Sequence, residues 1–175
     1  MRVSRWLAGS RQRERRWENL LGLAIVVALM AYALYAEHVL GLEACPLCIF
    51  QRMAFIGLGA VFLVAALHNP AGLAARAYGV VLIAVAAVGA GIAGRHVYIQ
   101  NLPAEQVPAC GPGLDYIMDA FPLLEALELV FTGSGECAVV NWSFLGLSMP
   151  GWTFIWFVLL AILGVAANWK RLAPT

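Results

Sequence analysis

Four long apolar runs interrupt the otherwise mixed pattern of this chain, at residues 19–37, 49–67, 77–95 and 150–168. Each run approaches or exceeds the ~17–25 residues with which an α-helix crosses a bilayer. The charged residues lie in the connections, in the tails or at the ends of the runs, with Arg52 as the exception. The pattern therefore predicts an all-α membrane protein, with a single four-transmembrane-helix bundle as its one domain over residues 1–175.

The amino-acid composition is also typical of a membrane protein. Hydrophobic residues make up 62% of the sequence and charged residues 12%, and the mean hydropathy is +0.81. Soluble domains are about 45–50% apolar and ~25% charged, so a soluble domain is excluded. The net charge is only +1. We expect no nucleic acid as a partner.

Basic residues are distributed unequally among the connections. Arginines and a lysine crowd the two ends of the chain, at Arg2, Arg5, Arg11, Arg13, Arg15, Arg16, Lys170 and Arg171. Between His96 and Trp169 there is no lysine or arginine. Because cytoplasmic loops are enriched in basic residues, we expect residues 1–18, 68–76 and 169–175 in the cytoplasm. The segments 38–48 and 96–149 are then the outer loops, on the opposite side of the membrane.

The first run has an alternative interpretation as a cleavable signal peptide. Basic residues precede it, and Ala31-Tyr32-Ala33 loosely resembles a cleavage site. Its apolar core is longer than the ~7–15 residues of a signal peptide, which favours a retained span.

All four cysteines (Cys45, Cys48, Cys110 and Cys137) fall in the two segments expected outside, where disulfides persist. Three interpretations stay open. A zinc site is weakly supported, because only one C-x-x-C is present. Two structural disulfides would brace the loops. Redox exchange is favoured by the C-x-x-C itself, since closing so small a ring stabilises little and the motif recurs at reactive thiols.

The local sequence "CPLCIFQR" at 45–52 puts the C-x-x-C at the outer end of the second span. Pro46 suits the first turn of a helix, where its missing N–H costs nothing. The positive end of the helix dipole favours a thiolate there. We expect Cys48, which is nearer the lipid, to be the more functional thiolate.

Arg52 follows Cys48 by four residues, so both can share a helix face. One interpretation is that it extends its charge to the headgroups. The other is functional, because a guanidinium stabilises a thiolate or an oxyanion. Electrons leaving a thiol pair at the bilayer edge need an acceptor in lipid. Since haem, flavin and iron–sulfur motifs are missing from the sequence, a membrane quinone fits by elimination.

These residues resemble the DsbB-type disulfide bond formation proteins of bacterial inner membranes. The matching pieces are "CPLCIFQR" at 45–52, Cys110 and Cys137 in the second outer loop, and "FLGLSMPGW" at 144–152. The resemblance covers nearly the whole chain. A C-x-x-C that opens the second span separates this family from vitamin K epoxide reductase-like proteins, in which the active C-x-x-C belongs to a later span.

The resemblance implies the disulfides Cys45–Cys48 and Cys110–Cys137 and a relay between them. A reduced, thioredoxin-like periplasmic oxidase of the DsbA type would attack the second disulfide through Cys110. The freed Cys137 would attack Cys45, leaving Cys48 as the thiolate that faces the quinone, with Arg52 assisting. The implied cofactor is ubiquinone or menaquinone. The implied activity is that of a protein-dithiol:quinone oxidoreductase, which supports disulfide formation in periplasmic proteins.

Two further features carry weaker expectations. Family members can have a quinone-binding histidine near the outer end of the third span, and His96 in "GRHVYIQ" is the candidate here, although a solvated histidine is the alternative. Apolar residues at spacings of three or four over 114–131 predict a short amphipathic helix on the membrane surface. We expect no resident metal. The alternatives to redox catalysis are a membrane scaffold with bracing disulfides and a thiolate metal-handling protein.

Overall fold

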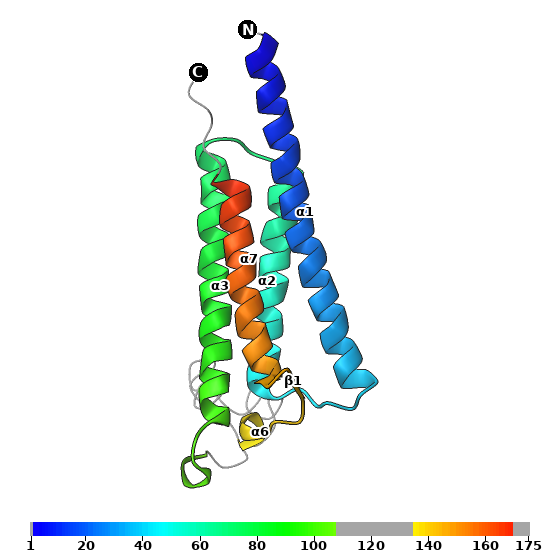
Figure 1. Ribbon diagram of the computed structural model, residues 1–175, viewed down its shortest axis with the longest axis vertical. Helices are drawn as coiled ribbons and strands as arrows, with labels where there is room; N and C mark the ends of the chain where they lie inside the picture. The colour runs from blue at the N-terminus through cyan, green and yellow to red at the C-terminus, as the bar shows by residue number, and fades with distance from the viewer. Residues whose placement is uncertain (1, 108–134, 170–175) are drawn as a thin grey trace, which may run out of the picture.

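Four long helices form the bundle in the computed structural model, which describes residues 2–107 and 135–169 (Figure 1). They are α1 (Arg2–His38), α2 (Pro46–His68), α3 (Leu73–Gln100) and α7 (Met149–Asn168). Each is long and apolar enough to cross a membrane, and in α1 the qualifying stretch is Gln12–His38. The predicted all-α, four-helix membrane architecture is confirmed.

The helices extend beyond the apolar runs that predicted them. α1 begins at Arg2, well before residue 19, and α3 continues to Gln100, beyond residue 95. The residues added to α1 include several arginines and glutamates, which are good helix formers, so that helix does not need to stop where the apolar run ends. Hydropathy therefore locates a span but not the ends of its helix.

Short elements lie at the end of the bundle opposite the two chain termini (Figure 1). They are η1 (Ala104–Gln106), α6 (Gly135–Ala138), β1 (Ser143–Phe144) and β2 (Leu147–Ser148). The antiparallel strands pair Ser143 with Ser148 and Phe144 with Leu147. The predicted amphipathic helix at 114–131 lies outside the described residues, as does Cys110.

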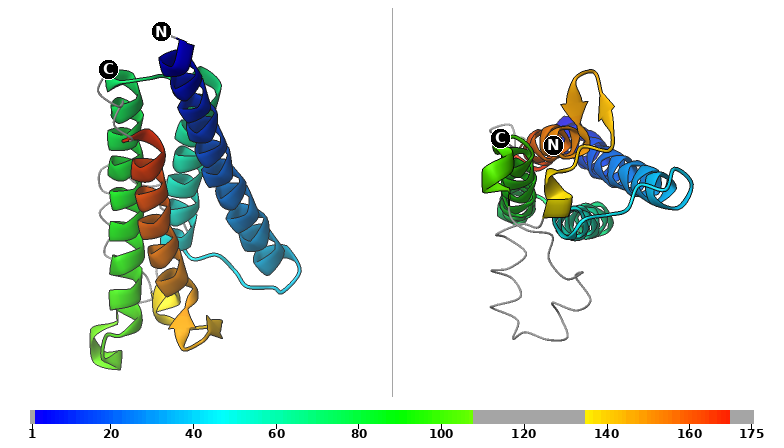
Figure 2. Two further views of the ribbon diagram at one scale, coloured as in Figure 1. Left: turned by 45° about the horizontal axis from the view of Figure 1, so that its top comes forward. Right: turned by 90° about the horizontal axis from the view of Figure 1, so that it is seen from below.

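The long helices follow one another around the bundle in the order α1, α2, α3, α7. α2 and α7 each contact both α1 and α3, and the contact between α3 and α7 is the most extensive (Figure 2). Inside this ring the Phe55 and Phe157 rings stack with centroids 4.1 Å apart. Small residues allow the close approach. A Cβ added at Gly89 would lie 2.3 Å from the Phe157 ring.

Buried amides join the helices near the chain termini. The Asn168 side chain donates to Asn19 Oδ1 at 3.1 Å, and both residues are almost fully buried. The Arg15 guanidinium donates to the Pro70 carbonyl in the α2–α3 connection. These contacts tie α1, α7 and the connection 69–72 together at one end, which leaves the cysteines at the other.

Candidate functional site

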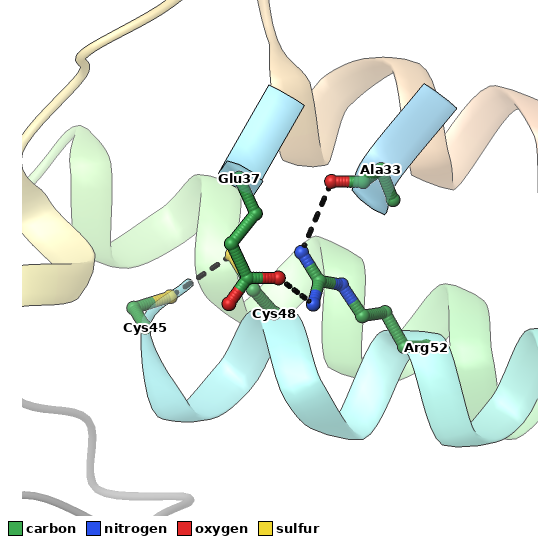
Figure 3. Close-up of polar contacts among 5 residues, drawn as sticks. All are labelled: Ala33, Glu37, Cys45, Cys48 and Arg52. Carbon is green, nitrogen blue, oxygen red and sulfur yellow. Dashed lines mark hydrogen bonds and ion pairs between the residues drawn. The ribbon is translucent and has the colours of Figure 1, made fainter. Parts of the chain in front are cut away.

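The C-x-x-C lies at the N-terminus of α2. Cys45 is the N-cap residue, with extended backbone, and Pro46 occupies the first turn. The first backbone bond of the helix runs from Ile49 N–H to Cys45 O. The Cys45 and Cys48 Sγ atoms are 3.0 Å apart (Figure 3). The first turn of an α-helix therefore brings the two sulfurs together, and the positive end of the helix dipole lies beside them.

His96 is buried directly behind this pair, at 3% exposure. Its Nε2 lies 3.8 Å from Cys45 Sγ and 3.1 Å from the Cys137 carbonyl oxygen. The interpretation of His96 as a solvated interface residue is therefore wrong. The histidine predicted from the sequence belongs to the cysteine cluster, although a role for it in quinone binding stays a prediction.

A chain of hydrogen bonds holds the His96 ring. Thr153 Oγ1 donates to Gln51 Oε1, and Gln51 Nε2 donates to His96 Nδ1 at 3.1 Å. With Nδ1 as acceptor, the ring hydrogen is on Nε2, which donates to the Cys137 carbonyl. Gln51 is also buried, at 3% exposure, and Thr153 is half-buried, so the chain links α7, α2, α3 and α6 largely out of solvent.

Cys137 is fully buried and lies next to the C-x-x-C. It shares one apolar cluster with Cys45, Leu47, Ile92 and Ile99, and Cys48 packs against that cluster. The structure therefore brings three of the four predicted cysteines to one place. The partner expected for Cys137, Cys110, lies outside the described residues.

Arg52 turns toward α1, one helical turn beyond Cys48. Its Nη1 forms an ion pair with the Glu37 carboxylate, and its Nη2 lies 3.4 Å from the Ala33 carbonyl oxygen (Figure 3). The Arg52 side chain is 21% exposed and that of Glu37 31%. The positive charge is thus held in place by the C-terminal end of α1 rather than extended to solvent.

A cavity of about 260 Å³ connects these groups. Its lining includes Cys45, Cys48, Arg52, Phe55, His96 and Trp156. Helices α1, α2, α3 and α7 all contribute to the wall, which is mainly apolar. The cavity therefore joins the sulfur pair and the guanidinium in one compartment between the helices.

The β1–β2 hairpin lies over α7 beside the cavity. Leu145 and Gly146 both have positive φ (51° and 78°), as the two-residue type I′ turn requires. Trp152 Nε1 donates to the Phe144 carbonyl at 3.0 Å. Trp142, which lines the cavity, packs against Tyr32 of α1 with centroids 6.2 Å apart. The "FLGLSMPGW" stretch thus builds part of the cavity rim.

Three site residues were missed by the sequence analysis: Glu37, Gln51 and Thr153. Gln51 gave a usable signal, because it is a polar residue inside an apolar run. Glu37 sits at the end of the first run and Thr153 near the start of the last. No local spacing connects either of them with the C-x-x-C. Near His96, the Arg95 guanidinium lies over the Tyr98 ring, 5.2 Å from its centroid.

Known proteins match almost the whole chain. The family model for disulfide bond formation protein DsbB matches residues 15–167. A protein named disulfide bond formation protein B from Nitrosococcus oceani is 53% identical over 155 residues, which cover 89% of this chain and 90% of the relative. Its namesake from Saccharophagus degradans is 55% identical over 150 residues, covering 86% and 90%. That from Marinobacter nauticus is 48% identical over 159 residues, covering 91% and 95%.

Proposed function

This chain belongs to the DsbB family of disulfide bond formation proteins, and on that premise we propose that it is a protein-dithiol:quinone oxidoreductase. It takes electrons from a reduced, thioredoxin-like periplasmic oxidase of the DsbA type and passes them to membrane quinone. The observation that carries the proposal is the Cys45–Cys48 pair, 3.0 Å apart, opening on an apolar cavity that also contains Arg52.

The cavity wall suits an isoprenoid quinone, whether ubiquinone or menaquinone. Aromatic and aliphatic side chains line most of it, and Cys48 and Arg52 are among its polar lining groups. When bound there, a quinone supplies an acceptor for two electrons and two protons. Arg52 supplies a fixed positive charge where negative charge develops, and Glu37 holds the guanidinium in position.

The cysteines form the electron route to that cavity. The partner's thiolate attacks the disulfide between Cys110 and Cys137, which joins the partner to Cys110 and releases Cys137 as a thiolate. Cys137 then attacks Cys45, breaking the Cys45–Cys48 bond and leaving Cys48 with the electron pair. Cys137 and Cys45 belong to the same buried cluster, so this second exchange needs little movement of either.

Each complete cycle is balanced. The partner's dithiol loses two electrons and two protons and becomes a disulfide, and the quinone gains both. Afterwards the two disulfides of this chain are restored. Cys45 serves as the electrophile and Cys48 as the group that delivers electrons, because Cys48 lies one helical turn from Arg52 and both line the cavity.

The test is quinone reduction by the purified protein in detergent, with a reduced thioredoxin-like partner. We expect Cys48→Ser to abolish quinone reduction and Cys110→Ser to abolish exchange with the partner. Arg52→Met should raise the KM for quinone and leave partner exchange intact. Persistent quinone reduction in Cys48→Ser would overturn the assigned roles. Disulfides that only brace the loops would instead resist mild reductant in the wild-type protein.

A further inference from the structure

Cys45, Cys48 and His96 together form a cluster of metal-ligand atoms, and all three atoms lie within 4.8 Å of one another. We propose that the reduced dithiol and the His96 imidazole bind a thiophilic divalent cation such as Zn²⁺. Only Cys45 and Cys48 are close to each other in the sequence. His96 joins them because α3 packs against α2, which places residues 45 and 96 side by side.

The distances suit tetrahedral zinc. With Zn–S near 2.3 Å and Zn–N near 2.0–2.1 Å, the edges of the tetrahedron are about 3.7 Å for S···S and about 3.5 Å for S···N. The corresponding separations here are 3.0 Å between the sulfurs and 3.8 Å between Cys45 Sγ and His96 Nε2. The third separation, between Cys48 Sγ and the His96 ring nitrogen, is at most 4.8 Å, so modest side-chain rotations are needed to complete the geometry.

The Cys137 carbonyl oxygen is placed to supply the fourth ligand. It lies 3.1 Å from His96 Nε2, close to the about 3.3 Å of an N···O edge around zinc. Binding also keeps the cluster neutral. Two thiols release two protons as they become thiolates, so that the divalent cation and its ligands are neutral together. A neutral complex suits a site packed against Leu47, Ile92 and Ile99.

Gln51 and Thr153 would act as the outer shell of the site. A metal-ligating histidine donates its other ring N–H to an acceptor. Turning the Gln51 amide over presents Oε1 to His96 Nδ1–H and moves the ring hydrogen away from Nε2. The Thr153 hydroxyl, which also lies 2.9 Å from the Pro150 carbonyl, then donates there and accepts from the Gln51 amide. Every polar group keeps a partner in the metal-bound form.

Binding depends on the redox state of the pair. A Cys45–Cys48 disulfide has no thiolate to offer, so only the reduced form binds the cation. The bound cation withholds both thiolates from exchange. If the protein has the function proposed above, Cys45 becomes a free thiolate once the partner has left as a disulfide and Cys110 attacks Cys137, which re-forms the Cys110–Cys137 bond. Zn²⁺ then binds the released Cys45–Cys48 dithiol and arrests the cycle there. Metal binding itself requires neither quinone nor a partner protein.

The direct experiment titrates the reduced, purified full-length protein with Co²⁺, whose thiolate complexes absorb in the near ultraviolet and the visible. We expect these bands, and their loss when Zn²⁺ displaces Co²⁺. Cys48→Ser should weaken binding by more than about 100-fold, since losing a ligand costs more than losing an outer-shell partner. His68→Ala is the control and should keep the bands, because His68 is a described histidine that does not belong to the cluster.

Gln51→Glu tests the geometry without removing a ligand. A carboxylate is a stronger acceptor for Nδ1–H, so we expect Co²⁺ affinity to rise by about tenfold or more. Unchanged affinity in Gln51→Glu would contradict His96 as a ligand. Retained bands in Cys48→Ser, or equal binding by diamide-oxidised protein, would overturn the site.

A final arm separates the two proposals. Zn²⁺ should slow quinone reduction by the wild-type protein, and a chelator should restore it. If Co²⁺ binds as expected but no quinone is reduced under any condition, the metal site stands and the proposed function fails. If quinone is reduced and no Co²⁺ binds to the reduced pair, the function stands and the metal site fails.

Discussion

Arg52 and Glu37 form an ion pair between α2 and α1, close to the sulfur atoms. A guanidinium inside a membrane helix is costly unless it has a partner, and the Glu37 carboxylate supplies one. Because both side chains keep some exposure, the pair contributes modestly to stability. Its larger effect is to fix the position of the Arg52 guanidinium in the cavity wall.

A double-mutant cycle measures this pairing. We expect Arg52→Met and Glu37→Gln to couple by about 0.5–1 kcal/mol in thermal unfolding in detergent, the range of partly exposed ion pairs. Glu43→Gln is the control, since Glu43 is an exposed acid in the neighbouring connection. Equal coupling of Arg52 to Glu37 and to Glu43 would show that the ion pair has no specific role.

The hydrogen-bond chain from Thr153 through Gln51 to His96 should contribute to stability. Gln51→Leu removes the partner of His96 Nδ1 in a buried site, and an unsatisfied buried polar group costs about 1–3 kcal/mol. We therefore expect the free energy of unfolding of Gln51→Leu to be lower than that of the wild type by this amount. Circular dichroism during chemical denaturation measures it.

The control for this prediction is an exposed hydrogen bond on α3. The Asn101 side chain donates to the Val97 carbonyl at 2.8 Å in an exposed position, so Asn101→Ala should cost less than about 0.5 kcal/mol. If Gln51→Leu were as mild as Asn101→Ala, the buried chain would not constrain His96.

Among the helices, close packing of α3 on α7 positions His96 and Thr153 on opposite sides of Gln51. Gly89 provides this approach, since the Phe157 ring fills the space that a side chain would take. In lipid, where helix association relies on van der Waals packing, such contacts decide which helix faces meet.

Gly89→Ala should therefore destabilise the bundle by about 1–3 kcal/mol, as overpacking of a core does. Gly91→Ala on the same helix is the matched control. A Cβ at position 91 meets nothing within 4 Å, and alanine is a better helix former than glycine. The melting temperature of the Gly91→Ala protein should therefore stay the same or rise. Thermal unfolding in detergent measures both variants. Equal effects of the two substitutions would rule out Gly89 as a packing contact.

The elements and the site differ in how far the sequence could predict them. A membrane span is contiguous in sequence, so the four helices were visible as apolar runs. Cys45, Cys48 and Arg52 follow one another at helical spacing at the start of α2, so their proximity could be predicted as well. The pairs His96–Cys45 and Thr153–Gln51 span 51 and 102 residues. They depend on helix packing, which periodicity does not reveal. The β1–β2 hairpin was missed because its two-residue strands are too short to give an alternating pattern.

For the whole molecule, the two ends of the bundle differ in chemistry. One end carries the termini and the 69–72 connection, where Arg15 and the Asn19–Asn168 pair are buried. The other carries the C-x-x-C, α6 and the hairpin (Figure 1). Because basic residues concentrate at the first end, we propose that it faces the cytoplasm and that the cysteine end faces the periplasm of a bacterial inner membrane.

Reporter cysteines in a background without the native four would test this orientation. Asn101→Cys places a thiol at an exposed position of the cysteine end, and Leu73→Cys places one at the opposite end, where Leu73 is 82% exposed. An impermeant maleimide added to intact spheroplasts should label Asn101→Cys at once and Leu73→Cys only after lysis. The reverse pattern would put the C-x-x-C in the reducing cytoplasm. A disulfide relay could not be maintained there, because cytosolic thiol systems keep such pairs reduced.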